Sequence, residues 1–218
     1  MPISDLFRGA PLATRWFLRA RSVFTRYDEI ARELPAQGRL LDLGSGHGLL
    51  AFTLSLRQPG REVIAIDHDA ERVRVAELAA LSLPAERRPR FEAGDLRKCL
   101  ASAAPGTIDG IAMLDVLHYF DRATHEMLFR DAWRALKPGG TLLMRDVDSD
   151  AGARFRANRV YERLATAIRF TKSTARTLHF RGRREWTDLL QTSRFTVRSK
   201  RTGPAIFADI LFVATKQQ

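Results

Sequence analysis

The chain has 218 residues, of which 45% are hydrophobic and 9% aromatic, and its formal net charge is +11. This composition supports one soluble domain, and no apolar run reaches the roughly 20 residues that a membrane-spanning helix needs. The single cysteine excludes an internal disulfide, and the five histidines show no metal-ligand spacing, so no metal site is predicted. The N-terminus lacks the apolar core and cleavage site of a secretory signal, which favours a cytoplasmic location.

The first predicted element is an amphipathic helical segment within residues 1–37. Its apolar residues recur at three- and four-residue steps, whereas four arginines, at positions 15, 19, 26 and 32, fall outside that stripe. We expect this segment to pack on the domain as a lid. The alternative is an interfacial helix on anionic lipid, at the inner face of the membrane. The members of the stripe are Leu12, Trp16, Ala20, Val23, Phe24, Tyr27, Ile30, Ala31 and Leu34.

A buried strand followed by a glycine loop is the most informative stretch of the chain. Residues 40–43 are mostly apolar, and Gly44, Gly46 and Gly48 follow at alternate positions. Glycine permits positive φ and a close approach of the backbone to a ligand. A helix predicted from about residue 47 to 57 would direct its first N–H groups at the same place. The dinucleotide-binding motif G-x-G-x-x-G would need glycine or alanine at position 49, where this chain has Leu49. The loop therefore does not match that motif.

Acidic residues follow the next three predicted strands. Asp67 ends the strand at 62–66, Asp95 follows the strand at 89–92, and Asp115 ends the strand at 110–114. A fifth strand is predicted at 141–144, after the segment Leu136-Lys137-Pro138-Gly139-Gly140. In an open α/β sheet these strand ends share one edge, where ligands bind. The alternative for Asp67 and Asp95 is a helix N-cap, for which Asp is a favoured residue.

In combination, these motifs resemble those of the class I S-adenosylmethionine-dependent methyltransferases. The resemblance implies an α/β, Rossmann-like seven-stranded mixed sheet of order 3-2-1-4-5-7-6, with the last strand antiparallel and helices on both faces. It assigns residues 38–218 to the methyltransferase domain, closed by a hairpin at 195–198 and 206–213. It also implies S-adenosyl-L-methionine as the cofactor. The residues it assigns to the cofactor are Asp42, Gly44, Ser45, Gly46, Gly48, Asp67, His68, Gly94, Asp95, Leu96 and Asp115.

Within that family, Asp42 and the glycine loop hold the methionine part, Asp67 the ribose and Asp95 the adenine amine, while His68 flanks the adenine. Methyl transfer from a sulfonium needs alignment and exclusion of water. A nucleophile that still carries its proton, such as a phenol, a hydroxyl or an acidic carbon, also needs a base to remove that proton. His118 is the leading candidate for this base. Its alternative role is a helix-start histidine bonded to backbone.

Further candidates lie near the ends of the fourth and fifth strands and in the segment that follows. Tyr119 and Asp146 are further catalytic candidates, with Asp148 beside them. Arg145 and Tyr161 are predicted to orient an acidic substrate.

The positive charge is concentrated in one quarter of the chain. Residues 151–202 contain fourteen Lys and Arg against three acids, and the remainder of the chain is balanced. We expect a basic helical substrate cover at about 151–192, with interleaved apolar residues. The alternative is a solvated helix surface in an arginine-rich chain. As a functional surface it would attract an acidic carrier protein, coenzyme A, an anionic membrane or a nucleic acid.

The segment after the fourth strand narrows the substrate class. Residues 115–120, Asp-Val-Leu-His-Tyr-Phe, look like the branch that modifies small molecules and lipids. They lack the Asn/Asp-Pro-Pro-aromatic motif of enzymes that methylate amines of nucleic acids. We therefore predict methyl transfer to an oxygen or carbon of an aromatic or polyketide-like acid, free, carrier-tethered or membrane-presented, as in bacterial aryl polyene pathways. The alternatives are an RNA methyltransferase holding phosphates on residues 151–202, and a non-catalytic binding subunit. The oligomeric state is not predicted.

Overall fold

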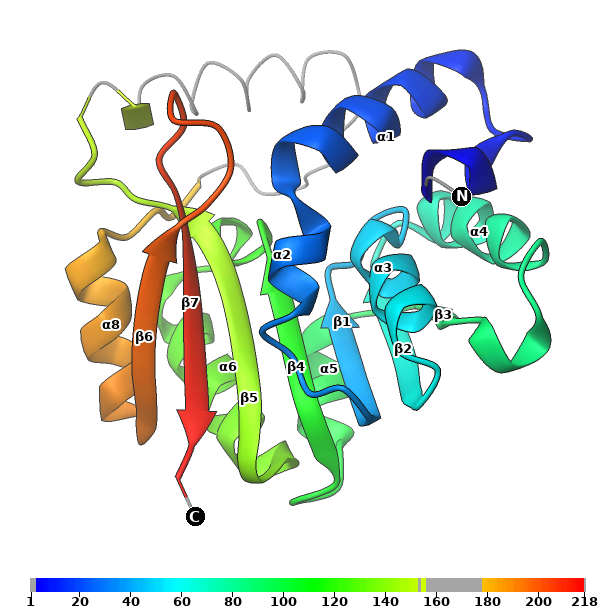
Figure 1. Ribbon diagram of the computed structural model, residues 1–218. Helices are drawn as coiled ribbons and strands as arrows, with labels where there is room; N and C mark the ends of the chain where they lie inside the picture. Colours follow the sequence, from blue (N-terminus) through cyan, green and yellow to red (C-terminus); the bar gives the residue numbers. More distant parts are fainter. Residues whose placement is uncertain (1–2, 153, 156–177, 218) are drawn as a thin grey trace.

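The computed structural model describes residues 3–152, 154–155 and 178–217 (Figure 1). Tyr161 and most of the basic cover predicted at 151–192 therefore lie outside the described residues. The described strands are β1 Gly38–Leu43, β2 Arg61–Asp67, β3 Arg90–Ala93, β4 Ile108–Leu114, β5 Leu136–Val147, β6 Phe195–Arg201 and β7 Asp209–Lys216. The described α-helices are α1 Leu12–Thr25, α2 Tyr27–Ala31, α3 Leu49–Arg57, α4 Ala70–Ala80, α5 Leu96–Ser102, α6 Arg122–Ala135 and α8 Arg183–Thr192.

These strands form one mixed sheet in the order β3-β2-β1-β4-β5-β7-β6. Strands β1 to β5 are parallel, and β7 runs antiparallel to both β5 and β6. The predicted fold class is thus confirmed. The fifth strand begins earlier than expected, because Leu136 already pairs with Ile108 before a register shift places Thr141 opposite Gly110.

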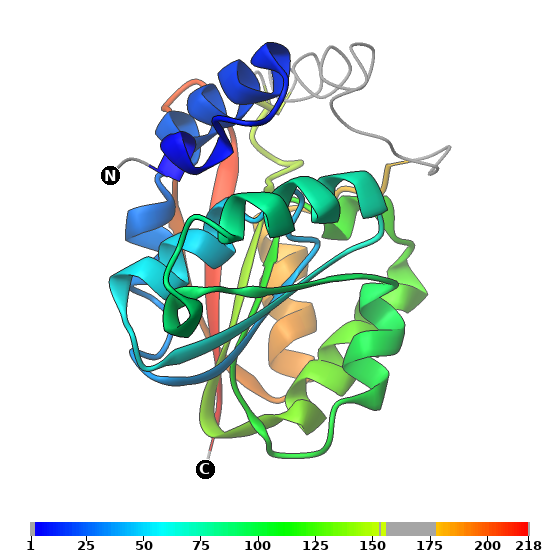
Figure 2. The same ribbon diagram turned by 90° about the vertical axis from the view of Figure 1, so that its right-hand side faces the viewer.

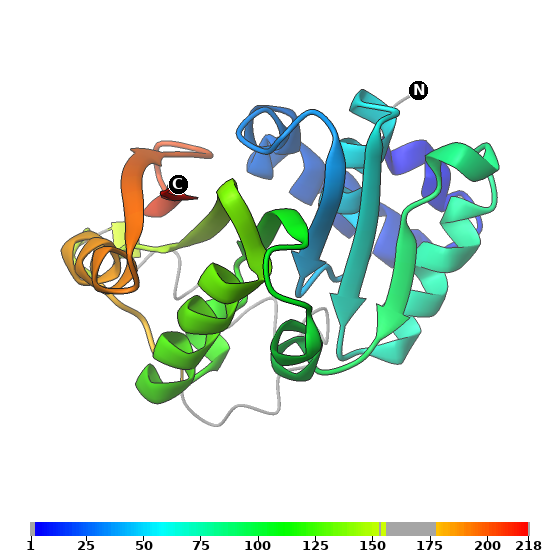
Figure 3. The same cartoon turned by 90° about the horizontal axis from the view of Figure 1, so that it is seen from below.

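Helices cover both faces of the sheet, as the views from the side and from below show (Figures 2 and 3). The reason is the alternation of side chains along each strand. In β4, Ala112 and Leu114 join the core beneath α1 to α4, whereas Ile111 and Met113 join the core beneath α5, α6 and α8. With apolar residues on both faces, the sheet leaves only its ends to form a polar site.

The N-terminal segment is one helical stretch in the prediction, whereas the structure has a 3₁₀ helix at Ile3–Phe7 followed by the two α-helices α1 and α2. Arg26 has φ 53°, a left-handed conformation that ends α1 and starts α2. The predicted apolar stripe is correspondingly divided, because Tyr27, Ile30 and Ala31 are buried while Trp16 is 70% exposed. Helix α1 instead contacts the domain through residues of its opposite face, such as Leu18, which is 1% exposed. No helix in the described part of the chain is long and apolar enough to cross a membrane.

Arg61 is a buried residue that ties this segment to the sheet. Its guanidinium donates hydrogen bonds to the carbonyls of Pro35 at 2.7 Å and of Ala31 and Leu34 at 2.9 Å. It therefore satisfies carbonyl groups at the end of α2, which would otherwise be buried without partners.

We expect Arg61→Leu to lower the free energy of unfolding by about 2–4 kcal/mol, because it leaves several buried carbonyls unpaired. The matched control is Arg39→Leu at the adjacent strand, where the lost ion pair with Glu62 is exposed and contributes at most about 1 kcal/mol. Urea unfolding followed by circular dichroism measures both. Equal effects of the two substitutions would contradict this role of Arg61.

Candidate active site

A cavity of about 700 Å³ opens at the carboxyl ends of the parallel strands. Ten of the eleven residues predicted to hold the cofactor line it, and so does Tyr119. Gly48 does not line the cavity, and a Cβ built on it would clash with the ring of Phe91. The lining consists of Phe17, Arg21, Tyr27, Asp42, Gly44, Ser45, Gly46, His47, Leu49, Leu50, Asp67, His68, Arg72, Ala93, Gly94, Asp95, Leu96, Arg97, Leu114, Asp115, Val116, Tyr119 and Phe120.

The glycine loop turns the backbone toward this cavity. Gly44 has φ 81°, and a Cβ built on it would lie 2.6 Å from the side chain of Val116. Gly46 has φ 57°, and a Cβ there would meet no atom within 4 Å. Both conformations favour glycine. The first glycine therefore allows the loop to approach the β4 end closely, and the second leaves open space beside the backbone.

Asp67 holds this loop in place. Its carboxylate accepts hydrogen bonds from the N–H of Gly46 at 2.7 Å and from the N–H of Asp69 at 2.9 Å. The N-cap of α4 is Asp69, so the capping role considered for Asp67 belongs to its neighbour. A carboxylate has about four acceptor sites, so Asp67 retains the capacity to accept from a ligand in the cavity.

Asp42 is a second buried acid in the lining, 2% exposed. Burial, together with the charge of Asp67, raises its pKa to about 7. Among the described residues, no group hydrogen-bonds to Asp42 Oδ2 or to the buried hydroxyl of Ser45. A ligand that brings positive charge and hydrogen-bond donors would satisfy these atoms, and S-adenosylmethionine has both. The residues present therefore fit this cofactor.

At the far side of the cavity, Asp95 combines two of the roles considered for it. It caps α5 by accepting from the N–H of Arg97 at 2.9 Å, and it also lines the cavity. The hydrogen bond from the Arg97 side chain lowers the pKa of Asp95. His68 is 61% exposed at its side chain, with Nδ1 3.4 Å from Asp67. Gly94 and Leu96 complete the lining beside Asp95.

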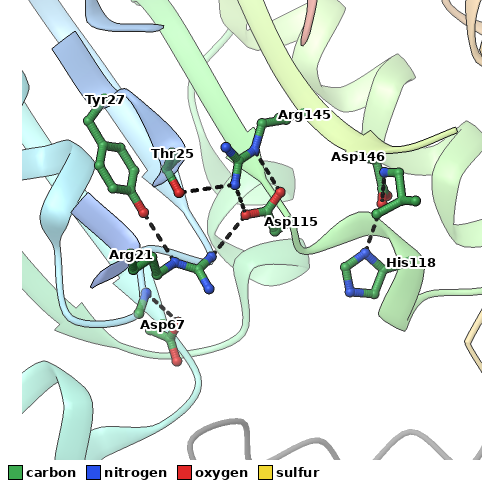
Figure 4. Close-up of polar contacts among 10 residues, drawn as sticks. Arg21, Thr25, Tyr27, Asp67, Asp115, His118, Arg145 and Asp146 are labelled. Atoms are coloured by element: carbon green, nitrogen blue, oxygen red, sulfur yellow. Dashed lines mark hydrogen bonds and ion pairs between the residues drawn. The ribbon is translucent and has the colours of Figure 1, made fainter. Parts of the chain in front are cut away.

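The Asp115 carboxylate is held by two guanidiniums (Figure 4). Arg21 of α1 donates to it at 2.9 Å, and Arg145 of β5 donates at 2.8 Å through Nε. Burial alone would raise the pKa of Asp115, but Arg145 and then Arg21 outweigh burial and lower it. Asp115 also has φ 55°, a strained conformation for a residue with a side chain. Arg145, predicted to bind substrate, is thus engaged in a buried ion pair.

A second, smaller cavity of about 50 Å³ lies next to the first, and both are lined by Arg21 and Asp115. His118 lines the smaller one. Its Nδ1 lies 2.8 Å from Oδ1 of Asp146, and both side chains are buried (Figure 4). An ionised Asp146 accepts the Nδ1 proton, which makes Nε2 the basic nitrogen of the ring. Two of the predicted catalytic residues therefore form one hydrogen-bonded pair.

Several lining residues had not been predicted, including Phe17, Arg21, Tyr27 and His47. The first three come from the N-terminal segment, and the spacing of Phe17, Arg21 and Thr25 at four-residue steps is the signal that marks this face of α1. Burial, helped by Arg72, lowers the pKa of His47 to about 4, so its ring is neutral at physiological pH.

The described basic residues of 178–202 are mostly engaged within the protein. Arg181 pairs with Glu185 at 2.5 Å, and Lys200 pairs with Glu33 at 2.6 Å. Arg194 lies over the ring of Trp133 at 5.2 Å. These basic side chains therefore make contacts within the protein and do not form a purely solvated surface.

Comparisons with known proteins agree with the fold and the cavity. A family model described as a methyltransferase domain matches residues 16–200. The ubiquinone biosynthesis O-methyltransferase of Xanthomonas axonopodis pv. citri is 32% identical over 149 residues, which cover 65% of this chain and 59% of that protein. The chain thus spans less than two thirds of this relative's length.

Solved structures share the fold at lower identity. A methyltransferase from Methanosarcina mazei matches with a TM-score of 0.64 and 22% identity, covering 87% of this chain and 97% of that one. Magnesium protoporphyrin IX methyltransferase from Synechocystis, solved with bound SAH, matches with a TM-score of 0.65 and 18% identity, covering 88% and 82%.

The sheet order and the cavity at its strand ends define a protein of the Rossmann-like methyltransferase class. The chain belongs to the methyltransferase domain family. S-adenosyl-L-methionine is its expected cofactor.

Proposed function

We propose that this enzyme transfers a methyl group to an oxygen or carbon nucleophile of a small acidic acceptor, aromatic or acyl in type. The observation that carries the proposal is the buried His118–Asp146 pair, of which His118 lines a cavity that shares Arg21 and Asp115 with the larger one. The O-methyltransferase of ubiquinone biosynthesis among its relatives supports a small acceptor. The acceptor is free or carried by an acidic protein or membrane, and the enzyme works in the cytoplasm.

In this proposal the larger cavity holds S-adenosylmethionine, which supplies an electrophilic methyl group on a sulfonium. Asp42 and the loop of Gly44, Ser45 and Gly46 receive the methionine part, where the buried carboxylate attracts positive charge. Asp67 accepts from the ribose, and Asp95 accepts from the adenine amine.

The smaller cavity receives the nucleophile of the acceptor. Asp146 fixes the orientation of His118 through Nδ1, so that Nε2 can take the proton of a phenol, hydroxyl or acidic carbon as the new bond forms. Tyr119, whose ring centroid lies 4.3 Å from that of His118, helps to exclude water. Orientation of the two reactants contributes the remainder of the rate enhancement.

Recognition of the acceptor's negative charge follows from the Arg21–Asp115–Arg145 cluster. Two guanidiniums face one carboxylate in this cluster, and Arg21 and Asp115 border both cavities. Asp209, which also lines the smaller cavity, interacts with Arg145. Arg21 is the more accessible cation, with 30% of its side chain exposed against 5% for Arg145. A carboxylate on the acceptor is therefore attracted mainly by Arg21.

The test is incubation of the enzyme with S-adenosylmethionine labelled in its methyl group and a cell extract, followed by mass spectrometry of the labelled products. We expect label in a small acid, attached to oxygen or carbon. Label in RNA would replace this proposal with the nucleic-acid alternative, and label on nitrogen would contradict the acceptor chemistry.

Cofactor affinity should depend on pH through Asp42. The folded-state pKa is raised to about 7, so the carboxylate is mostly protonated at pH 6 and becomes ionised above pH 7. A cationic ligand binds the ionised form better, so the dissociation constant should fall severalfold between pH 6 and pH 8. Asp42→Asn should remove the part of this dependence that comes from residue 42. Calorimetry at the two pH values measures the dissociation constant of the cofactor. If this constant changed equally with pH in the wild type and in Asp42→Asn, Asp42 would not be the source of the pH dependence.

A further inference from the structure

The outer face of α1 carries an apolar surface that remains exposed in the described part of the chain. We define the outer stripe of α1 as Leu12, Trp16, Ala20 and Val23, which follow one another at three- and four-residue steps and share one face of the helix. Leu12, Trp16 and Val23 are 68%, 70% and 68% exposed. A helix that packs only on its own domain turns such a stripe inward, and here the inward side carries Leu18 and Arg21 instead.

The outer stripe continues toward the smaller cavity. Phe24, at the end of α1, is 49% exposed and lines that cavity together with Pro204 and Phe207. Ile206, in the turn between β6 and β7, is 64% exposed. Figure 1 shows α1 and this turn at the same end of the molecule, above the ends of the strands. Phe24 therefore connects the outer stripe to the wall of the proposed acceptor site.

Positive charge borders the same surface. Helix α1 contains Arg15 and Arg19, both exposed, and its sequence has no acidic residue. Both arginines lie on the edge of the outer stripe in a helical projection. A second copy of the chain docked through α1 would bring these arginines against their own counterparts, which disfavours a symmetric dimer. An anionic surface instead complements the arginines while its interior accepts the apolar side chains.

We propose that the outer stripe of α1 binds the surface of anionic lipid bilayers, with Arg15 and Arg19 contacting headgroups. Trp16 and Val23 insert at the level of the headgroup–acyl boundary. The site on this face is separate from the cofactor cavity and does not depend on the proposed acceptor chemistry.

The test uses the full chain and vesicles of phosphatidylcholine, with or without phosphatidylglycerol. We expect cosedimentation with the anionic vesicles to exceed that with neutral ones at least tenfold and to weaken with added salt. Trp16→Ser combined with Val23→Ser should reduce binding at least tenfold, and Arg15→Gln combined with Arg19→Gln severalfold. The matched control is Leu78→Ser with Leu81→Ser, two exposed leucines in and just after α4, which should bind as the wild type does.

Because the substituted side chains are exposed, thermal unfolding and S-adenosylmethionine binding should be unchanged in every variant. Failure of the proposed acceptor chemistry would therefore leave the vesicle result intact. Binding to anionic vesicles that survives the Trp16 and Val23 substitutions would overturn the proposal and assign it to the basic segment. Absence of binding, or dimerisation through α1 in sedimentation velocity, would overturn it as well.

Discussion

Asp67→Ala is expected to weaken S-adenosylmethionine binding at least tenfold. The carboxylate holds the N–H of Gly46 at 2.7 Å and that of Asp69 at 2.9 Å, so its loss loosens the glycine loop. It also removes the proposed acceptor for the ribose hydroxyls. Each charge-assisted hydrogen bond contributes about 1.5–3 kcal/mol, which corresponds to more than a tenfold change in affinity. Titration calorimetry of the purified variant measures this change.

The matched control for that experiment is Asp109→Ala. Asp109 lies on β4, outside the cavity lining, where it accepts from the N–H of Arg39 and pairs with Lys137 at 2.7 Å. Its loss affects stability and should leave cofactor binding unchanged. If a folded Asp67→Ala protein bound the cofactor with wild-type affinity, the assignment of Asp67 to the cofactor would be wrong.

His118→Gln is expected to lower kcat by about 10²–10⁴-fold while cofactor affinity stays within a factor of two or so of wild type. The reason is that His118 lines the smaller cavity only, whereas the cofactor is proposed to occupy the larger one. Asp146→Asn should lower kcat as well, because it no longer stabilises the protonated ring. The measurement is steady-state kinetics with the acceptor that the labelling experiment identifies.

The control is His125→Gln, a second buried histidine, which bonds the carbonyl of Leu117 at 2.8 Å and lines neither cavity. This substitution should lower stability without a comparable loss of kcat in the folded protein. Loss of the acid limb of the pH–rate profile in His118→Gln, but not in His125→Gln, is the signature of a base. A His118→Gln enzyme with wild-type kcat and an unchanged profile would exclude that role.

The sequence was sufficient for those features that follow from local pattern. Alternating glycines after a buried strand, and acids at successive strand ends, predicted the edge at which the cavity opens, because parallel strands place equivalent ends together. The order of the strands was implied by the family resemblance that these motifs carry, and the structure has that order. Asp67 ends one parallel strand and Gly46 follows another at this same edge, and the N–H of Gly46 donates a hydrogen bond to the carboxylate of Asp67.

Contacts between distant segments were decided by tertiary structure alone. Nothing in the local pattern shows that Arg21 would reach Asp115, or that Arg145 would be buried against the same carboxylate, because these contacts join residues 94 and 30 positions apart. The direction of the α1 stripe was likewise undetermined, since periodicity shows that a helix has an apolar face but not which neighbour, if any, covers it. The contacts of a side chain depend on which distant segments the folded chain brings next to it. A periodic sequence pattern describes only the local helix or strand and does not identify those segments.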